Sequence, residues 1–141
     1  MEEVKKQGME SLFVPYEIAL VLRELGFDKP CLGYYFGKDK QVYTSNEDVK
    51  PPFMPSLDSK VMFRAPLYQQ AFRFFREKYG LIGFISFNEK STFRIETLPH
   101  SNIKLNSYKE KYFDNNGELW NTYEEAELAC LIKLIEIVKT K

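Results

Sequence analysis

The sequence predicts an α+β fold: a two-layer sandwich in which a mostly antiparallel, four-stranded sheet carries three helices on one face. Three observations lead to this prediction. Three segments repeat apolar residues at the 3.6-residue period of an amphipathic helix. Two pairs of short apolar runs are separated by turn residues, as in β-hairpins. Helices and hairpins alternate along the chain, in the order αββαββα, which leaves the helices together on one side of the antiparallel strands.

The first helix and hairpin have clear boundaries. Pro15 suits the first turn of a helix, and the apolar period continues to Leu25, where Gly26 predicts the end. Two short strands, Cys31–Phe36 and Gln41–Ser45, follow on either side of a turn and predict a hairpin. The connection Asn46–Lys60 after them is expected to be irregular, and connections this long are often functional or disordered.

The second helix and hairpin repeat this arrangement. A helix is expected over Pro66–Tyr79, ending at Gly80. Leu81–Phe87 and Thr92–Thr97 are expected to be strands joined by a turn, and Phe93 and Ile95 alternate with polar residues, so that one face is solvated. Together these segments form the second expected hairpin.

The last third of the chain is harder to assign. Ile103–Leu105 reads as a short strand, and Asp114–Gly117 as a turn. The final helix is expected from Tyr123 to about Val138, and Thr122 and Glu125 have the spacing of a capping box.

Each predicted helix opens with the pattern Tyr-x-x-Ala, at Tyr16, Tyr68 and Tyr123. The first two helices also follow a proline and precede a hairpin. The pattern indicates either a duplicated helix–strand–strand unit with a closing helix, or a coincidence between amphipathic helices. The sequence leaves both interpretations open.

Length and composition limit the classes of protein to which this chain could belong. A chain of 141 residues predicts one domain over 12–141 after a flexible tail over 1–11, and it needs no metal to fold. Equal numbers of basic and acidic residues do not favour a dedicated nucleic-acid binder. The two cysteines lie apart in apolar runs and read as buried free thiols of a reducing compartment. With no leader and no apolar stretch long enough to span a bilayer, we expect a cytoplasmic protein without membrane contact.

The residues that could carry catalysis have simpler structural interpretations. His100 is the only histidine, and its pairing with Cys31 or Ser101 competes with a solvated loop position. The carboxylates of Glu124, Glu125 and Glu127 could hold a metal, but the first turn of a helix favours negative charge in any case. No phosphate loop or nucleophile elbow is present. We therefore expect no catalytic, cofactor or metal residues and no enzyme activity.

Two groups of residues are candidates for binding a partner. Phe53 and Met54 lie between prolines, which lower the entropy cost of ordering a binding loop, although they could instead cover the edge of the core as a lid. Arg64, Arg73, Arg76 and Lys78 form a local basic group that could bind nucleic acid or a nucleotide. The rings between these arginines share a wide apolar arc and are expected to be buried, which makes base stacking on them less favourable.

The apolar arcs of the second and last helices are wider than a single buried stripe requires, so each must contact more than the sheet. Another helix, a second subunit or a target protein could supply that contact. Lys78 and Glu127 fall inside these arcs, and we expect them to pair or to reach solvent past the helix ends. Binding to another protein, or self-association, is the leading hypothesis.

Segments within the three helices carry a family resemblance, covering about 50 residues over 12–19, 64–79 and 120–131. They resemble small uncharacterised proteins that are encoded by phages, prophages and other mobile elements of gut bacteria. The resemblance implies a cytoplasmic accessory protein of phage or mobile-element growth. It implies no catalytic residue.

Overall fold

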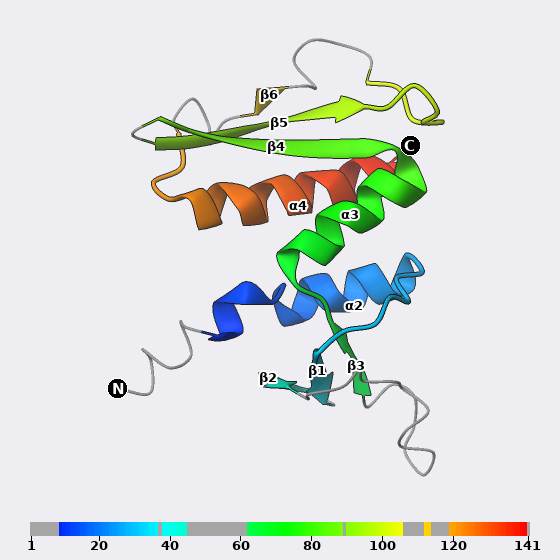
Figure 1. Ribbon diagram of the computed structural model, residues 1–141, viewed down its shortest axis with the longest axis vertical. Helices are drawn as coiled ribbons and strands as arrows, with labels where there is room; N and C mark the ends of the chain where they lie inside the picture. Colours follow the sequence, from blue (N-terminus) through cyan, green and yellow to red (C-terminus); the bar gives the residue numbers. More distant parts are fainter. Residues whose placement is uncertain are drawn as a thin grey trace. The chain divides into compact units, whose positions relative to one another are not determined.

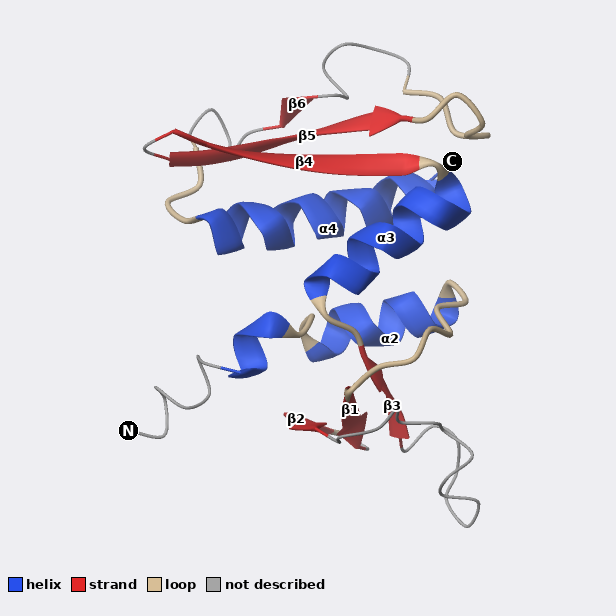
Figure 2. Cartoon of the chain, viewed as in Figure 1, coloured by secondary structure: helices blue, strands red, loops and turns tan. Residues whose placement is uncertain are grey.

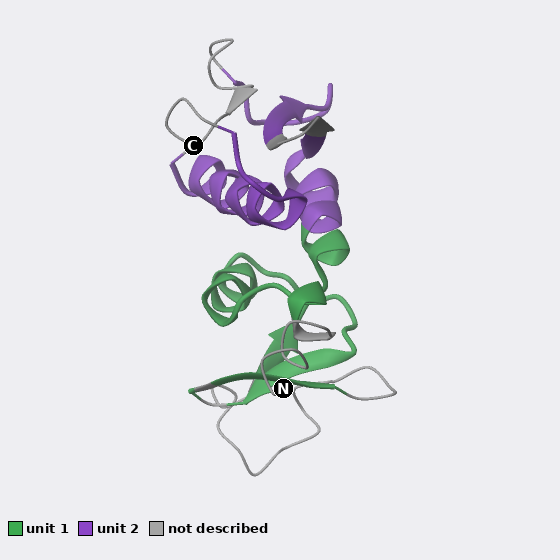
Figure 3. Cartoon of the chain, turned by 90° about the vertical axis from the view of Figure 1, so that its left-hand side faces the viewer, with its two compact units in different colours: residues 1–71 green, residues 72–141 purple. Residues whose placement is uncertain are grey.

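The computed structural model describes residues 9–36, 38–44, 62–88, 90–105, 112–113 and 119–140. The chain divides into two compact units, residues 1–71 and 72–141 (Figure 3), and each is described by itself. The expected single domain over 12–141 stays a prediction. Within the expected tail, Met9–Leu12 forms a short 3₁₀ helix, η1, and residues 1–8 lie outside the described part of the chain.

The α+β class is confirmed, but the single four-stranded sheet with three helices on one face is wrong. The described strands form two separate antiparallel sheets, with the orders β2-β1-β3 and β4-β5-β6 (Figures 1 and 2). A third strand pairs with each predicted hairpin, and the two resulting sheets are not hydrogen-bonded to each other in the described part of the chain. The strands are β1 (Gly33–Phe36), β2 (Asp39–Thr44), β3 (Met62–Ala65), β4 (Leu81–Asn88), β5 (Lys90–Thr97) and β6 (Tyr112–Phe113).

Helix α2 (Tyr16–Glu24) begins and ends within one residue of the boundaries predicted for the first helix, Pro15 and Leu25. Pro15 is its N-cap, and Gly26 follows its C-cap with φ of +100°. The N–H of Gly26 donates to the carbonyl of Arg23, and the N–H of Phe27 donates to the carbonyl of Leu22. This pair of bonds is a Schellman motif, which needs a residue at positive φ and so explains the glycine.

Aromatic rings fill the space between α2 and its sheet. The Tyr16 ring lies 5.3 Å from the rings of both Tyr35 and Phe63, edge to face. The Tyr35 hydroxyl donates a 2.6 Å hydrogen bond to the carbonyl of Val14. Tyr35 and Phe63 are almost fully buried, so the inner face of this sheet is the core of the first unit.

Helix α3 (Tyr68–Tyr79) ends where the sequence predicts, at Gly80, whose φ is +68°. Ser101 closes this end of the helix: its hydroxyl donates to the carbonyl of Tyr79 and accepts from the N–H of Ile103. The N–H of Leu98 donates to the carbonyl of Gly80. These bonds fix the segment after β5 against the start of β4.

Helix α4 (Tyr123–Thr140) begins with the predicted capping box. The N–H of Glu125 donates to the Thr122 hydroxyl, and the N–H of Thr122 donates to the Glu125 carboxylate, both at 3.1 Å. The helix packs along β4 and β5 (Figure 1). A Cβ placed on Gly83 of β4 would lie 2.6 Å from the Cys130 sulfur and 3.0 Å from the Phe72 ring. Helices α3 and α4 therefore cover the same face of this sheet.

Several smaller predictions differ from the structure. Ile103–Leu105 is not a strand. The N–H of Ile103 donates to the Ser101 hydroxyl rather than to a neighbouring strand. Strand β4 extends to Asn88 and β5 begins at Lys90, so both strands reach into the expected turn over residues 88–91. Most of the connection 46–60 and the turn 114–117 lie outside the described residues.

The alanine of each Tyr-x-x-Ala pattern is buried: Ala19 is 1% exposed, and Ala71 and Ala126 are 0% exposed. The pattern therefore marks the position where the first turn of each helix contacts its core. The two sheets do not repeat each other, since the first strand of one sheet is central and the first strand of the other is at an edge. Their topology argues against an intact duplication.

Candidate binding site

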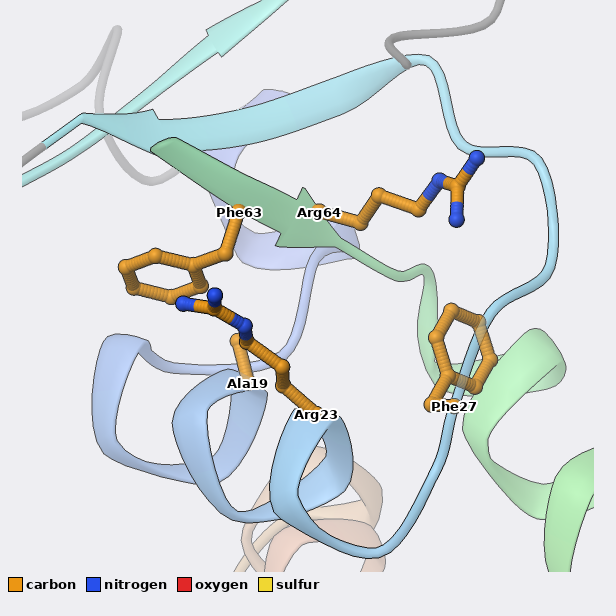
Figure 4. Close-up of a pocket in the computed structure, with 5 residues that line it drawn as sticks. All are labelled: Ala19, Arg23, Phe27, Phe63 and Arg64. Carbon is orange, nitrogen blue, oxygen red and sulfur yellow. The ribbon is translucent and has the colours of Figure 1, made fainter. Parts of the chain in front are cut away.

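A pocket lies between α2 and β3 in the first unit (Figure 4). Its lining combines two arginines with apolar side chains: Ala19, Arg23, Phe27, Phe63 and Arg64. Its volume of about 40 Å³ exceeds the roughly 10–15 Å³ that one water needs, so it has room for a group of a few atoms. It is too small to enclose a whole drug-sized ligand.

Each lining residue is placed by its local structure. Ala19 and Arg23 are four residues apart in α2 and so share one side of the helix. The Schellman motif after α2 turns the chain back and places Phe27 beside them. Phe63 points from β3 into the core, and the next residue, Arg64, begins on the opposite face of the strand.

Arg64 reaches its position because β3 is an edge strand of the described sheet. Its side chain extends along this edge toward the segment after Phe27 (Figure 4), where one of its terminal nitrogens donates a 3.0 Å hydrogen bond to the carbonyl of Asp28. The Arg23 side chain extends toward the Phe63 ring (Figure 4).

The two arginine side chains flank an apolar floor, and their guanidinium groups extend in opposite directions (Figure 4). Phe63 is 2% exposed and Phe27 is 8% exposed, whereas Arg23 is exposed and Arg64 is half-buried. Guanidinium groups bind carboxylates and phosphates through paired N–H donors, and a nearby apolar surface strengthens such bonds by excluding water. The chemistry of this lining suits a small acidic group attached to an apolar one.

The residues predicted from the sequence fall in different places. Arg64 lies in the pocket. Arg73 is exposed on α3 and forms an ion pair with Glu77 at 2.7 Å, whose hydrogen bond and charge raise the pKa of Arg73. Arg76 is exposed on the same helix. Phe53 and Met54 lie outside the described residues.

Sequence reasoning missed Arg23 and Phe27. Arg23 is on the polar side of an amphipathic helix, where an arginine is ordinary, and Phe27 follows a helix stop. Only the packing of α2 against β3 brings them to Arg64, and no local pattern in the sequence encodes that contact.

The residues considered for catalysis have structural roles or stand in solvent. His100 is exposed in a turn, and the Ser101 hydroxyl is bonded to backbone groups. Cys31 is buried, and its thiol donates to the carbonyl of Lys29. The Glu125 carboxylate accepts from the N–H of Thr122 in the capping box of α4.

Glu127 is half-buried, and burial followed by repulsion from Glu124 raises its pKa. Lys78 reaches solvent, as predicted, with its ammonium 5.5 Å from the centre of the Phe74 ring. Within the described ranges, no group of three or more His, Cys, Asp or Glu side chains is arranged to hold a metal ion. No helix in those ranges is long and apolar enough to cross a membrane.

Comparison of the chain with protein-family models, with curated proteins and with solved structures gives no match. The function proposed below therefore depends on the geometry of the pocket and on the sequence.

Proposed function

We propose that the protein is a protein–protein interaction module without chemistry of its own, and that its pocket seats an acidic group of the partner. The observation that carries the proposal is the placement of Arg23 and Arg64 beside the buried rings of Phe27 and Phe63. An aspartate, a glutamate or a C-terminal carboxylate on a protein chain carries the required charge next to apolar groups.

The size of the pocket favours a protein partner over a free metabolite. A pocket of about 40 Å³ accepts one functional group, and one group alone gives little affinity after the entropy of association is lost. A macromolecular partner can supply the remaining contacts outside the pocket. By the family resemblance, we propose a host or phage protein in the cytoplasm as this partner.

The alternative, nucleic-acid binding through Arg73 and Arg76, has less support. Arg73 is held by Glu77, and the neighbouring Phe74 and Phe75 are 6% and 0% exposed. Buried rings cannot stack on bases, which removes the main contribution expected from aromatic residues in such a site.

A capture experiment with matched variants tests the proposal. The tagged full-length protein is used to capture partners from host lysate, with and without nuclease, and each recovered protein is then titrated in purified form. The test variant is Arg23→Gln with Arg64→Gln, and the control is Arg73→Gln with Arg76→Gln, which removes the same charge. Glutamine at position 64 retains an N–H donor for the Asp28 carbonyl.

We expect a nuclease-resistant partner whose affinity falls at least about tenfold in the test variant and stays unchanged in the control. One charge-assisted hydrogen bond contributes roughly 1.5–3 kcal/mol, which corresponds to about ten- to a hundredfold in affinity. Equal loss in both variants would show that only total charge matters. Recovery that disappears with nuclease and with the control variant would establish the nucleic-acid alternative instead.

A further inference from the structure

Strand β4 is an edge strand of the described sheet in the second unit. It pairs with β5 over its whole length, from Leu81 opposite Thr97 to Asn88 opposite Lys90, without a shift in register. Among the described residues, no strand pairs with its other edge. Alternate residues of an antiparallel strand direct their N–H and C=O groups to the same neighbour, so about half of β4 presents these groups to its other edge.

The other three sheet edges in the described chain carry features that prevent further pairing. Strand β6 has two residues, and β3 has four and includes an arginine. Strand β2 contains Asp39 and Lys40 and has an irregular register with β1. Short strands, charges and bulges are the usual protections of an edge.

Strand β4 has none of these protections. Its eight residues, Leu81–Asn88, include no charged residue and no proline. The side chains of Ile82 and Ile85, on opposite faces of the strand, are both partly exposed, and Phe84 is 36% exposed although Arg94 lies 4.2 Å above its ring. By contrast, Phe93 and Ile95 on the central strand β5 are 3% and 0% exposed.

We infer that β4 pairs in antiparallel fashion with β4 of a second copy of this chain, which joins two three-stranded sheets into one of six strands. A two-fold axis places residues of β4 opposite residues of β4. Because the strand is uncharged, no like charges meet across the new ladder, and the partly exposed isoleucines gain apolar neighbours. This interface is independent of the arginine pocket and of the function proposed for it.

The test is the molecular mass of the full-length protein in solution, measured by light scattering and sedimentation across a concentration series. We expect a dimer of twice the 16.7 kDa chain mass. The variant Ile82→Lys with Ser86→Lys places lysines along the seam, where those of the two copies repel each other. It should weaken the dimer at least tenfold.

The control variant is Thr92→Lys with Ile132→Lys. Like the β4 variant, it adds two positive charges and replaces one isoleucine and one residue with a hydroxyl group. Thr92 is opposite Ser86 on the central strand, and Ile132 is 46% exposed on α4. The control should remain dimeric. A monomeric native protein, a dimer that survives the β4 substitutions, or a control that dissociates equally would each overturn the inference.

Hydrogen exchange on the native protein gives a second test that does not depend on whether a variant folds. We expect amide protection in residues 81–88 to rise between dilute and concentrated samples, with little change in α4. A dimer whose formation leaves the exchange of β4 unchanged would place the interface elsewhere and refute the pairing.

Discussion

The close packing between β4 and its two helices in the second unit can be tested by exchanging volume between two residues. The change is Gly83→Ala combined with Cys130→Ala. A methyl group on Gly83 would lie 2.6 Å from the Cys130 sulfur, about 1 Å inside the ordinary contact distance of roughly 3.5–4.0 Å. Replacing Cys130 by alanine removes that sulfur and leaves space for the methyl group.

The expected magnitudes follow from this geometry. Overpacking costs about 1–3 kcal/mol, and replacing glycine in a strand returns about 0.5–1 kcal/mol, so Gly83→Ala alone should lose about 1–2 kcal/mol of unfolding free energy. Cys130→Ala removes one fully buried heavy atom and should lose about 1 kcal/mol. The double variant should lose about 1 kcal/mol or less, because the Phe72 ring, 3.0 Å from the new methyl group, is the main remaining crowded contact.

The assay is urea unfolding at 25 °C of the native protein, both single variants and the double variant. The coupling free energy should be about 1–2 kcal/mol in favour of the double variant, which is well above the roughly 0.3–0.5 kcal/mol expected for independent sites. Gly83→Ala with Cys31→Ala is the control, since Cys31 is buried in the first unit. The unfolding free energy lost by Cys31→Ala should add to that lost by Gly83→Ala. An additive result for the Cys130 pair would show that β4 and α4 are not in this contact.

Three further predictions concern stability. Thr122→Ala removes the hydroxyl that accepts from the N–H of Glu125 and should cost about 0.5–2 kcal/mol in thermal unfolding; an unchanged transition would argue against the cap. Tyr35→Phe leaves the Val14 carbonyl without the 2.6 Å bond from the tyrosine hydroxyl and should cost about 1–3 kcal/mol by urea unfolding, whereas a neutral result would mean that another donor reaches it. Because burial raises the pKa of Glu127 above 4.5, the folded state binds this proton more tightly than the unfolded state. The stabilisation from the protonated Glu127 carboxyl is therefore fully present at pH values below its pKa in the unfolded state. It is lost as the pH rises through its pKa in the folded state. Glu127→Gln should remove that decline in a series of unfolding curves from pH 4 to 7, and an identical pH profile would contradict the assignment.

Local signals in the sequence were enough to predict the helices. Proline at the start of α2, glycine after α2 and α3, and the Thr122–Glu125 pair before α4 each act within one or two turns of the chain. The geometry they impose does not depend on the rest of the fold, so the boundaries could be read directly.

The sheets were predicted less well because the pairing of an outer strand is decided over long sequence distances. Strand β3, Met62–Ala65, has only four residues and no alternation that distinguishes it from a loop. It becomes a strand by pairing with β1, whose Gly33 lies opposite Ala65. The same limit applies to the site: Arg64 was a candidate from its neighbours in the sequence, whereas Arg23 joins it only through tertiary packing.

The buried alanine at the start of each helix has a consequence for how this sequence can diverge. Ala19, Ala71 and Ala126 have almost no exposed surface to accommodate a larger side chain, and each added methylene in such a contact would push the helix start away from its core. Relatives should therefore keep alanine, glycine or serine at these three positions even where little else is retained. Three small residues at fixed distances from helix starts would then identify distant members of the lineage after overall identity has faded.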